Sequence, residues 1–210
     1  MSKNIAITIA RQYGSGGREI GERVADLLGI KHYDEELITM AASEGNLDQQ
    51  IATKADESAA NSLLYTLALG SNFFGSAMSF GYKPPLNDKL FLLQSDVIRR
   101  VSASESCVII GRCADYVLRE HPCRLSIFIY GDTTHRKERI MSRHEGTTEA
   151  QAIDLMNKTD RRRSSYYNFY TGGKWGKYDN YHLAINSSTL GIEGTAELIA
   201  EFAKKLMDSE

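Results

Sequence analysis

The sequence has no excess of charge of either sign. Its 210 residues include 25 lysines and arginines and 27 aspartates and glutamates, which gives a formal net charge of -2. Proteins that bind nucleic acid or anionic membrane surfaces usually carry a strong basic excess. We therefore expect no nucleic-acid and no membrane partner, and any basic patch should be local and serve a smaller ligand.

Long hydrophobic runs and paired cysteines are also absent. No stretch approaches the roughly 20 apolar residues of a membrane-spanning helix, and the apolar run at residues 5–10 ends too soon, at Arg11, for a signal peptide. The three cysteines, Cys107, Cys113 and Cys123, form no C-x-x-C pair, which favours small, buried, reduced thiols. These absences predict a soluble, cytoplasmic protein without disulfides.

No internal repeat or long linker divides the chain, and 42% hydrophobic residues can build a sizeable core. We expect one domain over residues 1–210, with a core of about residues 1–46, 86–145 and 182–210. Residues 47–85 change character, with phenylalanines among small residues and two prolines at the end. We interpret them as a mainly helical insertion whose aromatics form a satellite core or flank a ligand.

The rest of the chain is organised around residues 5–28. An apolar run with no charge before Arg11 predicts a strand buried on both faces of a parallel sheet. A glycine-rich turn follows, and then apolar residues recur at helical spacing up to Gly29. Glycines at a helix N-terminus let several backbone N–H groups converge on an anion. The segment therefore predicts a phosphate site formed by Gly14, Ser15, Gly16, Gly17, Arg18 and Glu19.

The turn departs from the phosphate-loop pattern G-x-x-x-x-G-K-[ST]. In the matching register, Arg11 stands at the first glycine, Gly17 at the lysine and Arg18 at the hydroxyl residue. We predict that Arg18 supplies the missing charge, because it begins the helix whose N–H groups face the phosphate. We expect Glu19 to pair with a basic residue or to cap backbone N–H groups.

A dinucleotide fingerprint competes for the same residues. Gly14 and Gly16 begin a G-x-G-x-x-G pattern, and Asp34 lies about where a ribose-binding carboxylate would stand. The third glycine position holds Glu19 instead. NAD binding is therefore kept as a weaker alternative.

Further strands are predicted at residues 30–33, 107–110, 124–130 and 182–186, with helices at 35–42, 87–104, 133–144, 147–170 and 192–207. About five strands separated by helices indicate an α/β fold with a doubly wound parallel sheet. Arg112 directly follows a strand, so topology places it in the ligand crevice at the carboxyl edge of the sheet. The alternative is a surface arginine paired to Asp115 or Glu120.

The region after residue 146 combines charge and aromatic rings. Residues 160–163 read Asp-Arg-Arg-Arg within a predicted helix, where successive residues point about 100° apart. One or two of these arginines can face a ligand, but not all three. The tyrosine-rich stretch that follows allows base stacking on single-stranded nucleic acid as one interpretation. A folded flap over the cleft suits the overall charge balance better.

Several long segments together resemble the cytidylate kinase-like family, and more loosely the nucleoside monophosphate kinases. They are ITIARQYGSGGREIGERVA, IKHYDEELI, CVIIGRCADYVL, DRRRSSYYNFYTGGKWG and YHLAINSSTLGI. The resemblance covers nearly the whole chain and implies a fold of P-loop kinase type. It also implies ATP and Mg²⁺ as cofactors and a small-molecule phosphate acceptor, with a nucleoside monophosphate such as CMP or dCMP as the leading one.

The resemblance further implies roles for particular residues. The loop from Gly14 to Glu19 would hold the ATP phosphates, residues 47–85 would be the monophosphate-binding insertion, and residues 146–181 the lid. Phosphoryl transfer needs mainly positioning and positive charge, so Mg²⁺ would be held by phosphates and water, with no metal-binding residue identified. The glycine at the lysine position keeps a second function open, a nucleotide-binding sensor or regulator without chemistry. The expected roles are catalysis by Arg18, Arg112 and Arg162, substrate binding by Asp34, Arg112 and Asp115, and a lid with Asp160, Arg161, Arg162 and Arg163.

Overall fold

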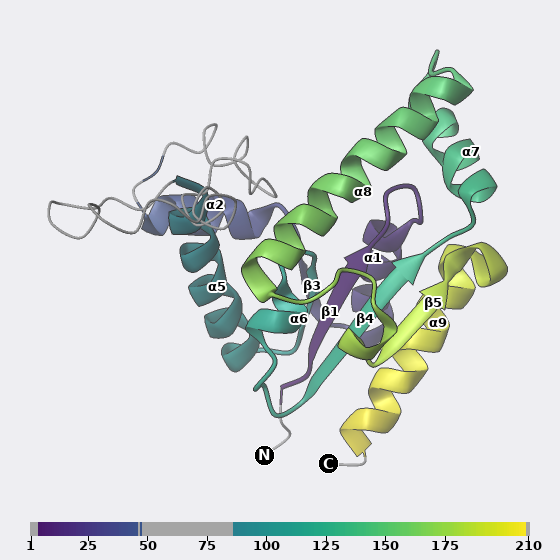
Figure 1. Ribbon diagram of the computed structural model, residues 1–210. Coiled ribbons are helices and arrows are strands. Elements are labelled where there is room, and N and C mark those ends of the chain that lie inside the picture. Colours follow the sequence, from purple (N-terminus) through teal and green to yellow (C-terminus); the bar gives the residue numbers. More distant parts are fainter. Residues whose placement is uncertain (1–3, 46, 48–85, 209–210) are drawn as a thin grey trace, which may run out of the picture.

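The computed structural model describes residues 4–45, 47 and 86–208 (Figure 1). The predicted insertion at 47–85 lies outside the described residues, apart from Leu47. Five parallel strands form one sheet in the order β2-β3-β1-β4-β5. They are β1 (Ala6–Arg11), β2 (Lys31–Tyr33), β3 (Cys107–Ile110), β4 (Arg124–Tyr130) and β5 (Leu183–Asn186).

The five-stranded parallel α/β fold is therefore confirmed. The chain crosses from β1 over β3 to β2 on one side, and from β3 over β1 to β4 on the other. Strand order thus reverses around β1, and in such sheets ligands bind outside the carboxyl ends of the strands at the reversal. The glycine turn after β1 and Arg112 after β3 both lie at this edge.

Alternation along the strands sends side chains to two cores. Ile7 and Ile9 of β1 pack with α1 (Gly17–Leu28) and α9 (Ser187–Asp208) on one face. Ala6 of the same strand joins the opposite core, with α2 (Glu36–Glu44), α5 (Leu86–Ser104) and α6 (Ala114–Val117). Because both faces are covered, every residue of β3 is buried. This explains why its sequence is a continuous apolar run.

Two further helices, α7 (Thr133–Arg143) and α8 (Glu149–Thr171), extend beyond the carboxyl ends of the strands (Figure 1). Thr148 caps α8: its hydroxyl accepts from the Gln151 backbone N–H, and the Gln151 side chain accepts from the Thr148 N–H. These two hydrogen bonds form a capping box, which fixes the start of α8. A short 3-10 helix, η1 (Tyr178–Asn180), connects α8 to β5.

Most predicted boundaries agree with the structure to within a few residues. The predicted last helix, residues 192–207, agrees with the part of α9 after the kink at Gly191, whose φ is 66°; the short helical segment at residues 187–190 before the kink was not predicted. All three cysteines are buried thiols, as predicted. No helix among the described residues has the length and apolar character to cross a bilayer.

Close packing of α1 on the sheet fixes the start of that helix. Gly21 is buried, and a Cβ atom there would overlap Cδ1 of Ile110 and lie 3.2 Å from Cδ1 of Ile9. Both isoleucines are fully buried, so neither side chain has room to move. The absence of a side chain at residue 21 therefore sets how near α1, and with it the glycine turn, approaches β1 and β3.

Gly21→Ala should lower the free energy of unfolding by about 1–3 kcal/mol, the usual cost of an extra carbon in a packed core. Ile110→Val removes the overlapped Cδ1 atom and alone should cost about 0.5–1.5 kcal/mol. Combined, the two substitutions should cost clearly less than the sum of the single variants, which urea denaturation of all four proteins measures. Strict additivity would show that this contact does not set the helix position.

Candidate active site

The glycine turn between β1 and α1 has the backbone of an anion-binding loop. Gly14 and Gly16 are left-handed, with φ of 80° and 78°. Gly16 is the N-cap of α1, and no side chain caps the helix there. Ser15 is buried: its hydroxyl donates to the Gln12 carbonyl, and its own carbonyl accepts from the Ser187 hydroxyl. These two hydrogen bonds therefore fix the turn, and the backbone N–H groups at the start of α1 face the carboxyl edge of the sheet.

A cavity of about 660 Å³ lies over this turn. Seven arginines and three carboxylates line it, so positive charge exceeds negative charge by four in a chain whose net charge is -2. Such a local excess attracts and concentrates a polyanion. The lining residues are Arg11, Gln12, Tyr13, Gly14, Gly16, Gly17, Arg18, Glu19, Asp34, Glu35, Arg112, Arg139, Ile140, Arg143, His144, Arg162 and Arg163.

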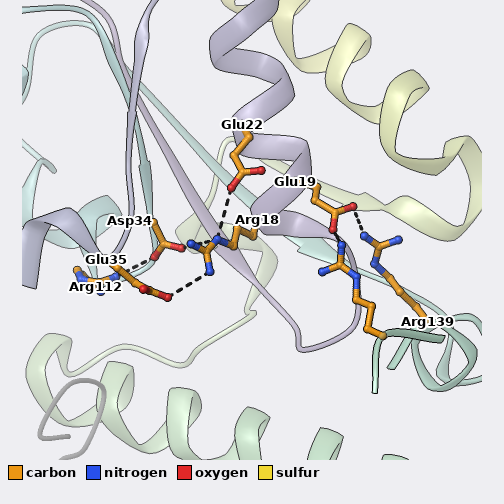
Figure 2. Close-up of polar contacts among 8 residues, drawn as sticks. Arg18, Glu19, Glu22, Asp34, Glu35, Arg112 and Arg139 are labelled. Carbon is orange, nitrogen blue, oxygen red and sulfur yellow. Dashed lines mark hydrogen bonds and ion pairs between the residues drawn. The ribbon is translucent and has the colours of Figure 1, made fainter. Parts of the chain in front are cut away.

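Asp34, at the end of β2, joins two of the arginines (Figure 2). Its Oδ1 lies 3.2 Å from Nη1 of Arg112, and its Oδ2 lies 3.1 Å from Nε of Arg18. Arg18 also contacts Glu35 at 3.2 Å and Glu22 at 3.4 Å. Partial burial by itself lowers the pKa of Arg18, but the neighbouring carboxylates, Asp34 first, outweigh it and raise the pKa. Arg18 is therefore permanently charged and points toward the end of β2.

Glu19 holds a second pair of arginines on the other side of the turn (Figure 2). Its two carboxylate oxygens form ion pairs with Arg139 and Arg143, one turn apart on α7. The prediction that Glu19 pairs with a basic residue is confirmed. Because one carboxylate pairs with two arginines, the group formed by Glu19, Arg139 and Arg143 keeps a net positive charge.

Arg112 is held in a strained segment. Gly111, Arg112 and Cys113 are consecutive left-handed residues, with φ of 74°, 55° and 54°. Left-handed backbone is unfavourable for residues with a Cβ atom, and such strain concentrates at functional sites. The segment turns the chain sharply after β3 and buries the Arg112 side chain, which is 2% exposed, beside Asp34. Arg112 is thus a cleft residue, and the alternative of a surface arginine paired to Asp115 or Glu120 is wrong.

Asp160 and Arg136 tie the helices α7 and α8 to the glycine turn. Asp160 accepts from the Tyr13 backbone N–H at 2.8 Å and from Arg136 at 2.5 Å, while Nε of Arg136 donates to the Tyr13 carbonyl at 2.7 Å. Arg136 is buried. Asp160, expected as a lid residue, therefore anchors the turn and does not line the cavity.

Asp115 was expected to contact substrate, but it does not line the large cavity; it lines a small neighbouring pocket of about 20 Å³. It is buried, and its Oδ2 accepts from the Tyr167 hydroxyl at 2.7 Å. Burial raises the pKa of Asp115, and burial together with Asp115 raises that of Tyr167. The bond to Tyr167 holds α8 against α6, so Asp115 has a structural contact in this fold, and its role toward substrate stays a prediction.

The aromatic stretch after Arg163 packs within the chain. Tyr170 stacks on Phe91 of α5 with ring centroids 4.1 Å apart, and Trp175 meets Phe128 of β4 edge-on at 5.2 Å. Tyr166 and Tyr167 are buried. Tyr170 thus fastens α8 to α5, and Trp175 fastens the following loop to β4, whereas Tyr178 is exposed.

The structure brings together most of the predicted site residues. Gly14, Gly16, Gly17, Arg18, Glu19, Asp34, Arg112, Arg162 and Arg163 line the cavity, whereas Ser15, Asp115, Asp160 and Arg161 do not. Sequence reasoning missed Arg139, Arg143 and His144. The signal available was their location on the helix directly after a buried strand, with the two arginines four residues apart on one face.

The strand order and the glycine turn define the class. In the dinucleotide-binding fold the order is 3-2-1-4-5, whereas here β3 lies between β2 and β1. The same overall fold occurs in shikimate kinase from Bacteroides thetaiotaomicron (12% identity, TM-score 0.53, covering 95% of this chain and 98% of that one). It also occurs in a gluconokinase from Sinorhizobium meliloti 1021 (13% identity, TM-score 0.51, covering 100% and 98%). The chain therefore has the fold of P-loop kinases, a class of phosphotransferases.

Within that class, residues 6–189 match the cytidylate kinase-like family, and the chain belongs to it. An uncharacterised protein from Eubacterium ventriosum ATCC 27560 shares 26% identity and a TM-score of 0.71, covering 96% of this chain and 99% of that one. Comparison with curated proteins gave no match.

Removing the charge of Asp34 should destabilise the protein, because Arg112 is buried beside it. For Asp34→Asn we expect a loss of about 3 kcal/mol in the free energy of unfolding, typical of breaking a buried ion pair on one side. Glu35→Gln is the matched control: its carboxylate also contacts Arg18, but it is 71% exposed, so the loss should stay below about 1 kcal/mol. Equal losses in urea denaturation would contradict the structural role of Asp34.

Proposed function

We propose that this protein transfers the γ-phosphoryl group of ATP to a nucleoside monophosphate, with CMP or dCMP as the leading acceptor. One observation carries the proposal: seven arginines converge on a cavity above an anion-binding glycine turn. Phosphoryl transfer asks a protein mainly for positioned positive charge, because negative charge spreads over the migrating group.

The structure of the glycine turn supports ATP as the phosphoryl donor in this proposal. The left-handed glycines and the uncapped start of α1 suit the phosphates of a nucleotide. Mg²⁺ would enter with ATP and neutralise negative charge on its phosphates. Among the described residues, no cluster of three or more histidines, cysteines or carboxylates offers a metal site of its own, so phosphates and water are the proposed ligands.

A phosphorylated acceptor is supported by the amount of charge. A monophosphate brings about two negative charges of its own, whereas a polyol acceptor brings none. Arginines come from both sides of the turn, with Arg18 and Arg112 near the end of β2 and Arg139 and Arg143 on α7. We assign Arg18 and Arg112, with Asp34 orienting them, to the acceptor side, and Arg162 of α8 to the migrating phosphoryl group.

The function is tested by incubating the protein with ATP, Mg²⁺ and a panel of nucleoside monophosphates and measuring ADP formation. We expect turnover with a pyrimidine monophosphate above the background hydrolysis measured without acceptor. If no monophosphate supports turnover, nucleotide kinase activity is rejected. Calorimetry then distinguishes the remaining candidates. Tight ATP binding without turnover favours the nucleotide-binding sensor, which is motivated by the glycine at the lysine position. Preferential NAD binding favours the dinucleotide alternative.

The two neighbouring arginines of α8 provide a matched pair for testing the role of Arg162. Both are exposed, but only Arg162 lines the cavity. Arg162→Ala should lower kcat/KM by roughly 10²- to 10³-fold, as for loss of a contact made mainly in the transition state. Arg161→Ala should change it less than about threefold. Equal effects of the two substitutions in the same steady-state assay would remove Arg162 from the proposed mechanism.

A further inference from the structure

Arg11 and Gly17 touch across the glycine turn. A Cβ atom built on Gly17 would lie 2.5 Å from Cβ and 3.0 Å from Cγ of Arg11. These are the inner atoms of the arginine side chain, which cannot swing away as its distal end can. Arg11 therefore occupies the space that a side chain at position 17 would need.

The backbone does not require glycine at position 17. Gly17 is the first residue of α1, and its φ is not among the positive values, unlike those of Gly14 and Gly16. Any L-residue can adopt that conformation. The contact with Arg11 is thus the steric reason for glycine at this point.

Arg11 and Gly17 are two of the three positions at which the sequence departs from the phosphate-loop pattern, the third being Arg18 at the hydroxyl position. The pattern has glycine first and lysine seventh, whereas this chain has Arg11 first and Gly17 seventh. We propose that the glycine and the cation have exchanged places across the turn, so that Arg11 supplies the phosphate contact of the missing lysine. This inference rests on the proposed function and names a further residue of the donor site.

The surroundings of both candidate arginines support Arg11 over Arg18. Arg11 lines the cavity beside Gly16 and Gly17, and its carbonyl accepts from Nη1 of Arg163 at 3.0 Å, which fixes the end of β1. Arg18, the residue that spacing alone favours, instead points to Asp34 and Glu35 at the end of β2. The charge next to the lysine position therefore comes from the strand before the turn.

The first experiment measures binding without turnover. Calorimetric titration of wild type and Arg11→Met with a non-hydrolysable ATP analogue plus Mg²⁺, and with inorganic tripolyphosphate, reports the contact to the terminal phosphates. We expect Arg11→Met to weaken both ligands at least tenfold, and Arg11→Lys to recover part of the loss. Arg161→Met, an arginine off the cavity, should bind like wild type, and circular dichroism with thermal melting checks that each variant is folded.

The second experiment restores the first glycine and the lysine of the phosphate-loop pattern. The double variant Arg11→Gly/Gly17→Lys has glycine first and lysine seventh, and it should bind the ATP analogue at least tenfold better than Arg11→Gly alone. Gly17→Lys alone should be impaired, because its new Cβ collides with Arg11. Comparison of the double variant with Arg11→Gly decides the matter even if the single Gly17→Lys protein does not fold.

The outcomes separate this inference from the proposed function. If wild type binds neither ligand, both the proposed function and the exchange are wrong. If wild type binds but Arg11→Met binds within twofold of it, the exchange alone is wrong. A double variant no better than Arg11→Gly would likewise overturn it.

Discussion

Repulsion between like charges is the constraint on which this site depends. Two cations a few ångströms apart repel by about 1 kcal/mol in water and by more in a partly buried cavity. Two carboxylates offset this repulsion, because each forms ion pairs with two arginines. Asp34 pairs with Arg18 and Arg112, and Glu19 pairs with Arg139 and Arg143. The arginines are thereby positioned without their charge being cancelled, because the cavity retains an excess of four.

The parallel sheet makes this arrangement reachable from distant parts of the sequence. Asp34 follows β2, Arg112 follows β3 and the glycine turn follows β1, and these three strands are neighbours with their carboxyl ends at one edge. Gly21 lets α1 approach that edge closely. Hydrogen bonds from Asp160 and Arg136 to the Tyr13 backbone then connect α8 and α7 to the turn. The contacts of Asp34 with Arg112 and of Asp160 with Tyr13 thus join segments that are far apart in the sequence.

Much of the fold could be predicted because its signals are local. A strand buried on both faces has an apolar run, and an amphipathic helix has a period near 3.6 residues, so the five strands and most helices were found. Arg112 was placed in the cleft by topology alone. The 100° rotation per helical residue also predicted that the run of arginines cannot act as a unit, and Arg162 and Arg163 line the cavity while Arg161 does not.

The rest of the site depends on contacts between segments, which spacing does not reveal. Asp115 and Asp160 carry charges suited to a ligand, yet Tyr167 and Arg136 hold their carboxylates inside the structure. Arg139 and Arg143 appeared as ordinary polar residues of a surface helix, because nothing along α7 shows that Glu19 lies opposite. The direction of Arg18 was hidden for the same reason, since three carboxylates from two elements decide it.

The carboxylates also bear on how an anion would enter. A phosphate that contacts Arg18 or Arg112 competes with Asp34 for the same donors, so its binding energy is the difference between two charge-assisted contacts. Arg11 lies beside the glycine turn, where the backbone N–H groups at the start of α1 add further donors and no side chain caps the helix. On the proposed function, the donor phosphates therefore meet backbone N–H groups as well as a side chain, while the acceptor must share or displace the ion pairs of Asp34. The Asp34 side of the cavity then decides which acceptor binds. The side of the turn next to Arg11 holds the nucleotide.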